Sequence, residues 1–228
     1  LKAAAGQVGG AGLDVDDVFS TFLYTTDGTS SKTITNNIDL SGEGGLVWLK
    51  RRSGSYSHSL YDTERGVQKQ LQSDATTAES TETGGLTAFT STGFTIGNVQ
   101  NQSALGDMVS WTFRKAPKFF DIVTYTGNGS QPRAINHNLG ATPGFIIVKR
   151  TDTTGSWQCR HRSLGSNDRI VLNSSSTAQS NAAFFFGDGT NPVAATSTQF
   201  TVADDAEVNA SGGTYVAYLF AHHDNDGS

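Results

Sequence analysis

Two carboxylates two positions apart, Asp62 and Glu64, come closest to a hydrolytic pair in this 228-residue chain. Such a pair cleaves a glycosidic bond when both groups face one cleft. The second candidate is the thiol of Cys159 with His161 as its base, because a nucleophilic cysteine needs a nearby proton acceptor. Neither pair has a convergent third group, and the chain lacks the GxSxG, HExxH, Walker and helix-opening GxGxxG motifs. The sequence therefore predicts a protein that is not an enzyme and needs no cofactor.

Acidic and histidine clusters near the two ends are candidate cation ligands. The segment Asp224-Asn225-Asp226-Gly227 is similar to the start of a calcium loop but lacks the later ligands, including the bidentate carboxylate. His222 and His223 are adjacent, and neighbouring strand residues point to opposite faces. Asp14, with Asp16 and Asp17, is expected to cap a short helical turn or to keep a sheet edge soluble. We expect no metal at any of these places.

Aromatic and polar residues beyond two predicted strands are the candidate binding site. Tyr56 is followed by His58, and Trp157 is followed by His161. Exposed aromatic rings beside hydrogen-bonding side chains are typical of sugar recognition. The alternative, which the pattern favours, is that each aromatic ring is buried on the next strand. These four residues are the predicted glycan contacts.

A tandem repeat organises the elements that position these residues. Six blocks recur in the same order about one hundred residues apart, and loops of Gly, Ser and Asn absorb the differences in length. The paired blocks are 22–29 with 123–130, 33–38 with 134–139, 45–51 with 144–150, 54–56 with 155–157, 92–96 with 198–202, and 108–113 with 215–220.

Each repeat reads as a small β-domain, because the blocks are short, rich in β-branched and aromatic residues, and bounded by Gly, Asn and Ser. The continuously apolar 46–49 and 145–148 predict central strands covered on both faces. We expect an all-β protein with two tandem β-sandwich-like (jelly-roll-like) domains, or closed barrels as the alternative. The expected boundaries are an Ala/Gly-rich N-terminal arm (1–18), domain 1 (19–115), a linker (116–121), domain 2 (122–221) and the start of another linker (222–228).

Composition excludes several classes of protein. The net charge of −5 argues against nucleic acid as a partner, since such binding needs clustered Lys and Arg. A single cysteine excludes an internal disulfide framework and a cysteine-based zinc site. No apolar run is long enough for a membrane span. The 26 glycines fit a chain of many turns.

The repeat resembles one found in tailed-bacteriophage tail-fibre and other virion appendage proteins. In the second unit the resemblance rests on residues 125–130, 135–140, 142–149, 161–165 and 209–218, and in the first unit on residues 42–50 and 60–66. It covers about residues 17–224 and implies no active-site residues.

The resemblance implies a structural virion protein, a tail fibre or tail-tip appendage involved in host adsorption. It also implies a homo-oligomer, with a trimer favoured, that contacts tail or capsid proteins through residues 1–18 and binds a host surface glycan. Two alternatives stay open: a capsid head-fibre or decoration protein, and a lectin-like carbohydrate-binding module.

Overall fold

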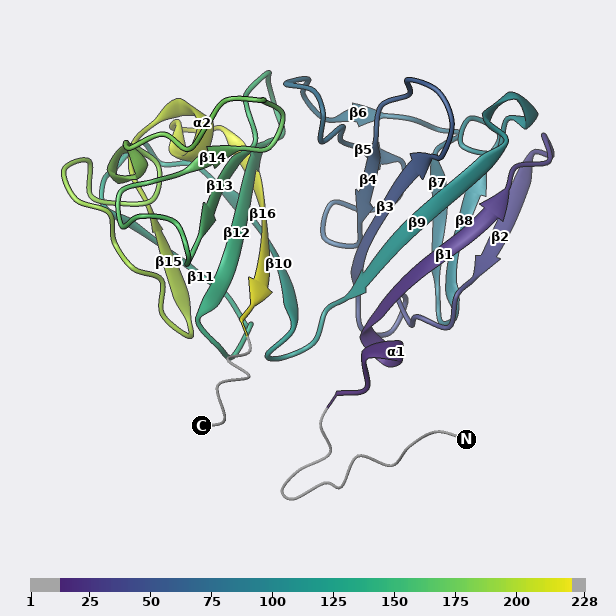
Figure 1. The fold of residues 1–228 in the computed structure, drawn as a ribbon, viewed down its shortest axis with the longest axis horizontal. Helices are drawn as coiled ribbons and strands as arrows, with labels where there is room; N and C mark the ends of the chain where they lie inside the picture. The colour runs from purple at the N-terminus through teal and green to yellow at the C-terminus, as the bar shows by residue number, and fades with distance from the viewer. Residues whose placement is uncertain (1–12, 223–228) are drawn as a thin grey trace.

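The computed structural model describes residues 13–222 as two β-rich halves that lie side by side (Figure 1). The predicted all-β fold is confirmed. The first half contains α1 (Val15–Val18), β1 (Phe19–Thr25), β2 (Ser31–Thr35), β3 (Gly45–Arg51), β4 (Ser59–Asp62), β5 (Lys69–Gln70), β6 (Ser80–Thr81), β7 (Leu86–Thr90), β8 (Gly93–Gly97), η1 (Ser103–Leu105) and β9 (Asp107–Arg114). The second half contains β10 (Phe120–Thr126), β11 (Arg133–Asn136), β12 (Pro143–Arg150), β13 (Gln158–His161), β14 (Ile170–Val171), η2 (Ala182–Phe184), β15 (Gln199–Val202), α2 (Ala206–Asn209) and β16 (Thr214–Ala221).

In each half two separate antiparallel sheets pack on either side of a core. In the first half the sheet β1-β9-β3-β4 faces β2-β8-β7, and in the second half β10-β16-β12-β13-β14 faces β11-β15. The strand order of the first half thus recurs in the second. Because the two sheets of each half are not joined by strand pairing, each half is a sandwich and not a closed barrel.

Matching buried asparagines fix the first turn of each half. Asn101 donates from Nδ2 to Asp27 Oδ1 (2.7 Å) and to the carbonyl of Thr29 (3.0 Å). Asn209 donates from Nδ2 to the carbonyl of Ser130 (2.7 Å), and its Oδ1 accepts from the backbone N–H of Asn128 (3.0 Å). Both asparagine side chains are fully buried, so they satisfy backbone groups that have no strand partner.

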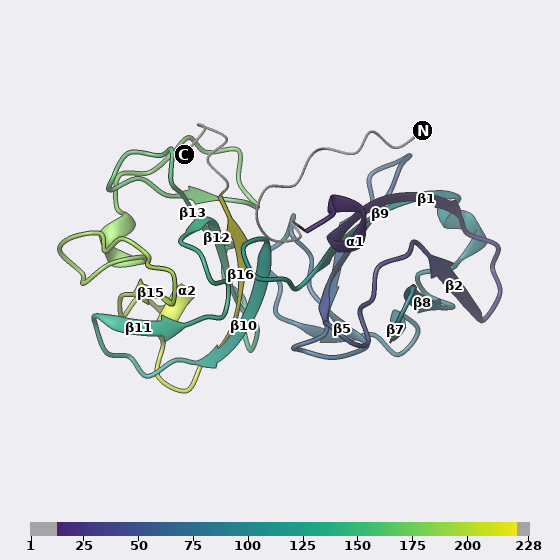
Figure 2. The same cartoon turned by 90° about the horizontal axis from the view of Figure 1, so that it is seen from below.

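A third core lies between the halves. The outer faces of the two large sheets meet there, and β10 and β16 lie against the first half (Figure 2). Side chains alternate along β3, where Val47 and Leu49 point into their own sandwich while Leu46 points into the junction. On this outer side the neighbouring domain covers Leu46, which is 1% exposed, whereas Trp48 is only partly buried. The buried members of this junction core are Leu46, Leu60, Leu71, Phe120, Ile122, Ile147, Trp157, Cys159, Val216 and Tyr218.

The segments around the domains differ in part from expectation. Asp14 caps α1 by accepting from the N–H of Asp16 (3.1 Å), as one of the two sequence alternatives had it. The strand β10 begins within the expected linker 116–121, because Phe120 and Asp121 are buried and pair with β16. Residues 1–12 of the expected arm and 223–228 of the expected second linker lie outside the described residues. The helices of the described part are too short to cross a membrane.

Candidate functional site

Trp157, the main predicted sugar contact, lies in the junction core. Its side chain is 0% exposed, and its Nε1–H donates to the carbonyls of Gln72 (2.9 Å) and Ala75 (3.1 Å) in the first domain. Its ring stacks on Tyr218 at 6.4 Å between centroids. Trp157 therefore presents no face to solvent, and the favoured alternative of a buried aromatic ring holds at this position.

The strand register also changes which residues of the two repeats are equivalent. Trp48 pairs with Leu60, whereas Ile147, its counterpart in the second repeat, pairs with Cys159. Leu60 and Cys159 are therefore equivalent. The residues two positions before them, His58 and Trp157, are also equivalent, so Trp157 does not correspond to Tyr56. The repeat alignment had matched the turn residues 54–56 with 155–157. A match between turns does not fix which residues of the following strands are equivalent.

Asp62 and Glu64 do not face one cleft. Asp62 is fully buried in the junction, where its Oδ2 accepts from Arg65 Nε (2.6 Å) and Tyr218 Oη (2.7 Å). Glu64 instead forms an ion pair with Lys115 (2.5 Å) near the surface. By strand register the counterpart of Asp62 in the second repeat is His161. Asp62 is therefore a structural residue of the junction, and the two carboxylates do not share a cleft.

Cys159 and His161 do not form a nucleophile and base. Cys159 is fully buried, and burial raises the pKa of its thiol to about 12. His161 accepts from the N–H of Ser163 at Nδ1 (3.1 Å), and its ring lies edge-on to Phe145. A buried thiol with a raised pKa holds too little thiolate to act as a nucleophile.

Tyr56 differs from Trp157, because it lies at the rim of a surface pocket of about 400 Å³. Its side chain is 48% exposed, and the guanidinium of Arg51 lies 4.4 Å from its ring centroid. Behind it the pocket is lined by polar side chains from the strands and loops between β3 and β9: Ser57, Ser59, Gln70, Gln72, Glu82, Gln100 and Gln102.

A hydrogen-bonded carboxylate forms the inner wall of this Tyr56 pocket. Glu82 Oε2 accepts from Tyr61 Oη (2.8 Å), Gln70 Nε2 (2.9 Å) and Gln100 Nε2 (3.2 Å). Burial and the Glu82 charge raise the pKa of Tyr61 well above its usual range. Glu82 is the one carboxylate lining this pocket. The chemistry of this wall suits binding of a polar ligand.

His58 lies beside that pocket but belongs to the outer face of the large sheet. Its Nδ1 accepts from Trp48 Nε1 (2.7 Å), and its backbone N–H donates to Asp74 Oδ1 (3.0 Å). Burial, followed by the charge of Lys50, lowers the pKa of His58 below its usual value. A lowered pKa keeps Nδ1 free of a proton, as the bond from Trp48 requires.

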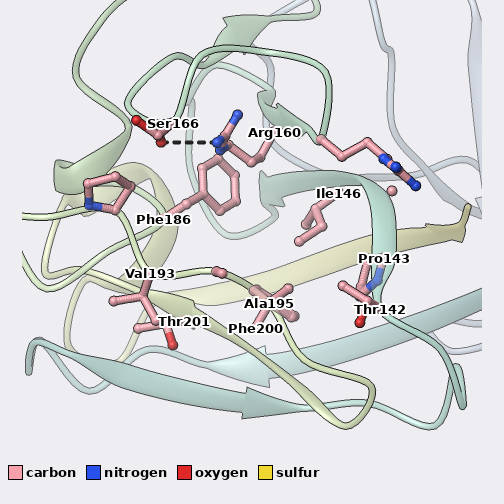
Figure 3. Close-up of a pocket in the computed structure, with 14 residues that line it drawn as sticks. Thr142, Pro143, Ile146, Arg160, Ser166, Phe186, Val193, Ala195, Phe200 and Thr201 are labelled. Carbon is pink, nitrogen blue, oxygen red and sulfur yellow. Dashed lines mark hydrogen bonds between the residues drawn. The ribbon is translucent and has the colours of Figure 1, made fainter.

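A second pocket, of about 300 Å³, opens in the second domain between β12, β13 and the segment before β15 (Figure 3). Ile146, Phe186 and Phe200 line it with apolar surface. Arg160 also lines this pocket, but its guanidinium donates to the carbonyls of His161 (2.9 Å) and Ser166 (3.0 Å). These hydrogen bonds show that Arg160 stabilises the loop that follows β13.

Within residues 13–222 the structure contains no group of three or more His, Cys, Asp or Glu side chains placed to hold a metal ion. His222 belongs to this part of the chain. His223 and the segment 224–227 with its calcium-loop likeness lie outside it. The acidic residues Asp14, Asp16 and Asp17 belong to the short helix and its cap.

Sequence reasoning missed the polar groups of both sites. Arg65 of the first domain and Tyr218 of the second meet across the junction, 153 residues apart in the chain, with Arg65 Nη2 donating to Tyr218 Oη (3.3 Å). Glu82 and Gln100 come from different loops of the first domain. Tyr56 is the pocket residue that the sequence analysis had already singled out.

Comparison with known proteins gives one family. A family model described as a domain of unknown function, DUF7483, matches residues 14–225, and the chain belongs to this family. None of the curated proteins matches. No solved structure matches either.

Proposed function

We propose that the chain is a structural protein of a tailed-phage virion, a tail fibre or tail-tip appendage that takes part in host adsorption. The observation that carries the proposal is the junction core, a third apolar core to which both sandwiches contribute buried residues. Such packing makes a spacer that holds its shape under load, whereas domains on a free linker move independently. The resemblance of the repeat to virion appendage proteins supports the same role.

The junction is also closed by polar contacts, which suits a spacer. The N–H of Glu79 donates to the carbonyl of Thr151 (2.9 Å), and the N–H of Gly155 donates to the carbonyl of Thr76 (2.9 Å). Arg65 is held between Asp62 and Glu79 at the same place. Hydrogen bonds between backbones fix the angle between the domains as well as their contact.

Antibody labelling of purified virions tests this proposal. Label along a fibre or at the tail tip is the expected result. Label on the head would favour the alternative, a capsid head-fibre or decoration protein. The absence of the chain from purified particles would contradict both virion roles.

A carbohydrate-binding module is the second candidate, and the Tyr56 pocket favours it. The exposed ring of Tyr56 offers a stacking face, and amides and hydroxyls line the pocket behind it. A glycan array tests it with the wild-type chain, Tyr56→Ala and, as a matched control in the other domain, Phe184→Ala. Binding that is lost in Tyr56→Ala and kept in Phe184→Ala is expected. No bound glycan, or equal binding by both variants, would contradict it.

A further inference from the structure

The same sheet face is covered in the second domain and open in the first. In the second domain Ile122, Ile147 and Tyr218 are at most 3% exposed, because the first domain covers them. Their register counterparts in the first domain are Thr21, Trp48 and Trp111. There Thr21 is exposed and both tryptophans are only partly buried.

This open face of the first domain is largely apolar, and Lys50 lies at its border, paired with Val109. Neighbours across β1, β9 and β3 bring one stripe of side chains to it, since directly paired residues share a face. Thr21 lies opposite Trp111, and Trp111 lies opposite Trp48. Leu23, 56% exposed, extends the stripe along β1 and lies opposite Val109, which is 8% exposed. We call the set Phe19, Thr21, Leu23, Trp48 and Trp111 the open face.

The open face runs directly into the junction core. The rings of Phe19 and Phe113 lie 4.9 Å apart, and Phe113 in turn contacts Phe220 of the second domain at 5.4 Å. Trp48 and Phe113 both pack against the buried junction residues. The apolar surface of the first domain therefore continues from the junction core onto the part of its large sheet that the second domain does not cover.

We propose that the open face is a docking surface for a second copy of this chain. In the second repeat this face is covered by a domain of the same fold, which is the argument for a like partner in the first. An apolar stripe of this kind on an otherwise polar surface is characteristic of a protein interface. The contact would join the spacers of the proposed appendage side by side. It depends on the sheet face alone and holds whether or not the chain is a virion protein.

Analytical ultracentrifugation of the full chain tests the proposal with two lysine substitutions at exposed apolar positions. Leu23→Lys places a charge on the open face, and Val193→Lys places one at a comparably exposed site in the second domain, 40% exposed in the native chain. The wild type is expected to self-associate at micromolar concentration. Leu23→Lys should weaken association roughly tenfold or more, as burying an unpaired charge requires, while Val193→Lys should leave it unchanged.

Hydrogen exchange locates the contact in the same samples. Amides of β1 and β9 should gain protection as the wild-type concentration rises, and those of β11 and β15 should not. A wild-type chain that stays monomeric, or a Leu23→Lys variant that associates as the wild type does, would overturn the proposal. Self-association that occurs only after removal of residues 1–12 would also overturn the proposal, since the chain's own N-terminal segment would then be what covers the open face.

Discussion

Tyr218 Oη donates a 2.7 Å hydrogen bond to Oδ2 of Asp62, joining an inner strand of one domain, β16, to the edge strand of the other, β4. Asp62 is fully buried and also accepts from Arg65. The charged pair is taken out of water at the junction, where the remaining lone pairs of the carboxylate must find donors. The phenol of Tyr218 is one of these donors.

Tyr218→Phe should therefore destabilise the chain. Removing the hydroxyl leaves the buried carboxylate with one donor fewer, at a cost of about 1–3 kcal/mol in the free energy of unfolding. Urea denaturation followed by fluorescence measures the change. Tyr56→Phe, at an exposed ring, is the matched control and should alter stability by less than about 0.5 kcal/mol. Equal stabilities for the two variants would show that the junction hydrogen bond contributes nothing.

Trp157→Ala separates a structural role from a sugar-binding one. The substitution removes a fully buried ring and leaves the Gln72 and Ala75 carbonyls without its N–H donor. We expect a loss of about 3–5 kcal/mol in the free energy of unfolding, as for other large core truncations. Thermal denaturation provides the measurement. A Trp157→Ala variant as stable as the wild type would mean that the ring is not buried in the junction.

Burial of Lys149 makes the free energy of unfolding depend on pH in the alkaline range. Its side chain is buried at the junction, where Nζ donates to the carbonyl of Arg150 (2.7 Å), and burial lowers its pKa from 10.5 to about 8. Between these two pH values the unfolded chain binds more protons than the folded one, so this lysine's contribution to stability rises with pH. Below about pH 8 the lysine is charged in both states and burial of the charge opposes folding.

Lys149→Met should accordingly be more stable than the wild type at pH 7, by about 1–3 kcal/mol. The advantage should shrink as the pH rises from 8 toward 10.5. Guanidinium denaturation of both proteins at several pH values measures the difference. The carbonyl of Thr76, a weaker partner of Nζ, keeps the N–H of Gly155 as a donor in the variant. A stability difference that does not change with pH would contradict the assignment.

The thiol of Cys159 is expected to be unreactive in the folded chain. It is fully buried, and burial raises its pKa to about 12. A thiol-specific chromogenic reagent should react roughly a thousandfold more slowly with the native chain than with the denatured chain at pH 8, because both access and thiolate are lacking. Rapid native labelling would place this thiol, and with it β13, at the surface.

The sequence predicted the class of the fold because the repeat and the strand signals are local. The apolar run 46–49 even predicted a strand covered on both faces. It did not predict the second cover, since contact between Leu46 and the second domain joins residues far apart in the chain. The alternating face pattern of a strand is the same whether its outer side meets another domain or a partner molecule.

The site was harder to predict than the fold. Tyr56 and Trp157 follow similar glycines, yet one lies at a pocket rim and the other in the junction core. The two hairpins have the same strand register, and the match between their turn glycines is shifted by two residues against it, so alignment by the turns misassigned the pair. The Glu82 cluster gathers side chains from separate loops, and no spacing along the chain encodes such a meeting.

Differential scanning calorimetry of the full chain tests the central claim, that the junction core joins the two repeats into one unit. The shared core predicts a single transition whose calorimetric and van't Hoff enthalpies agree. Tyr218→Phe should move that whole transition to lower temperature. Two resolved transitions, with only one of them shifted by Tyr218→Phe, would contradict the account.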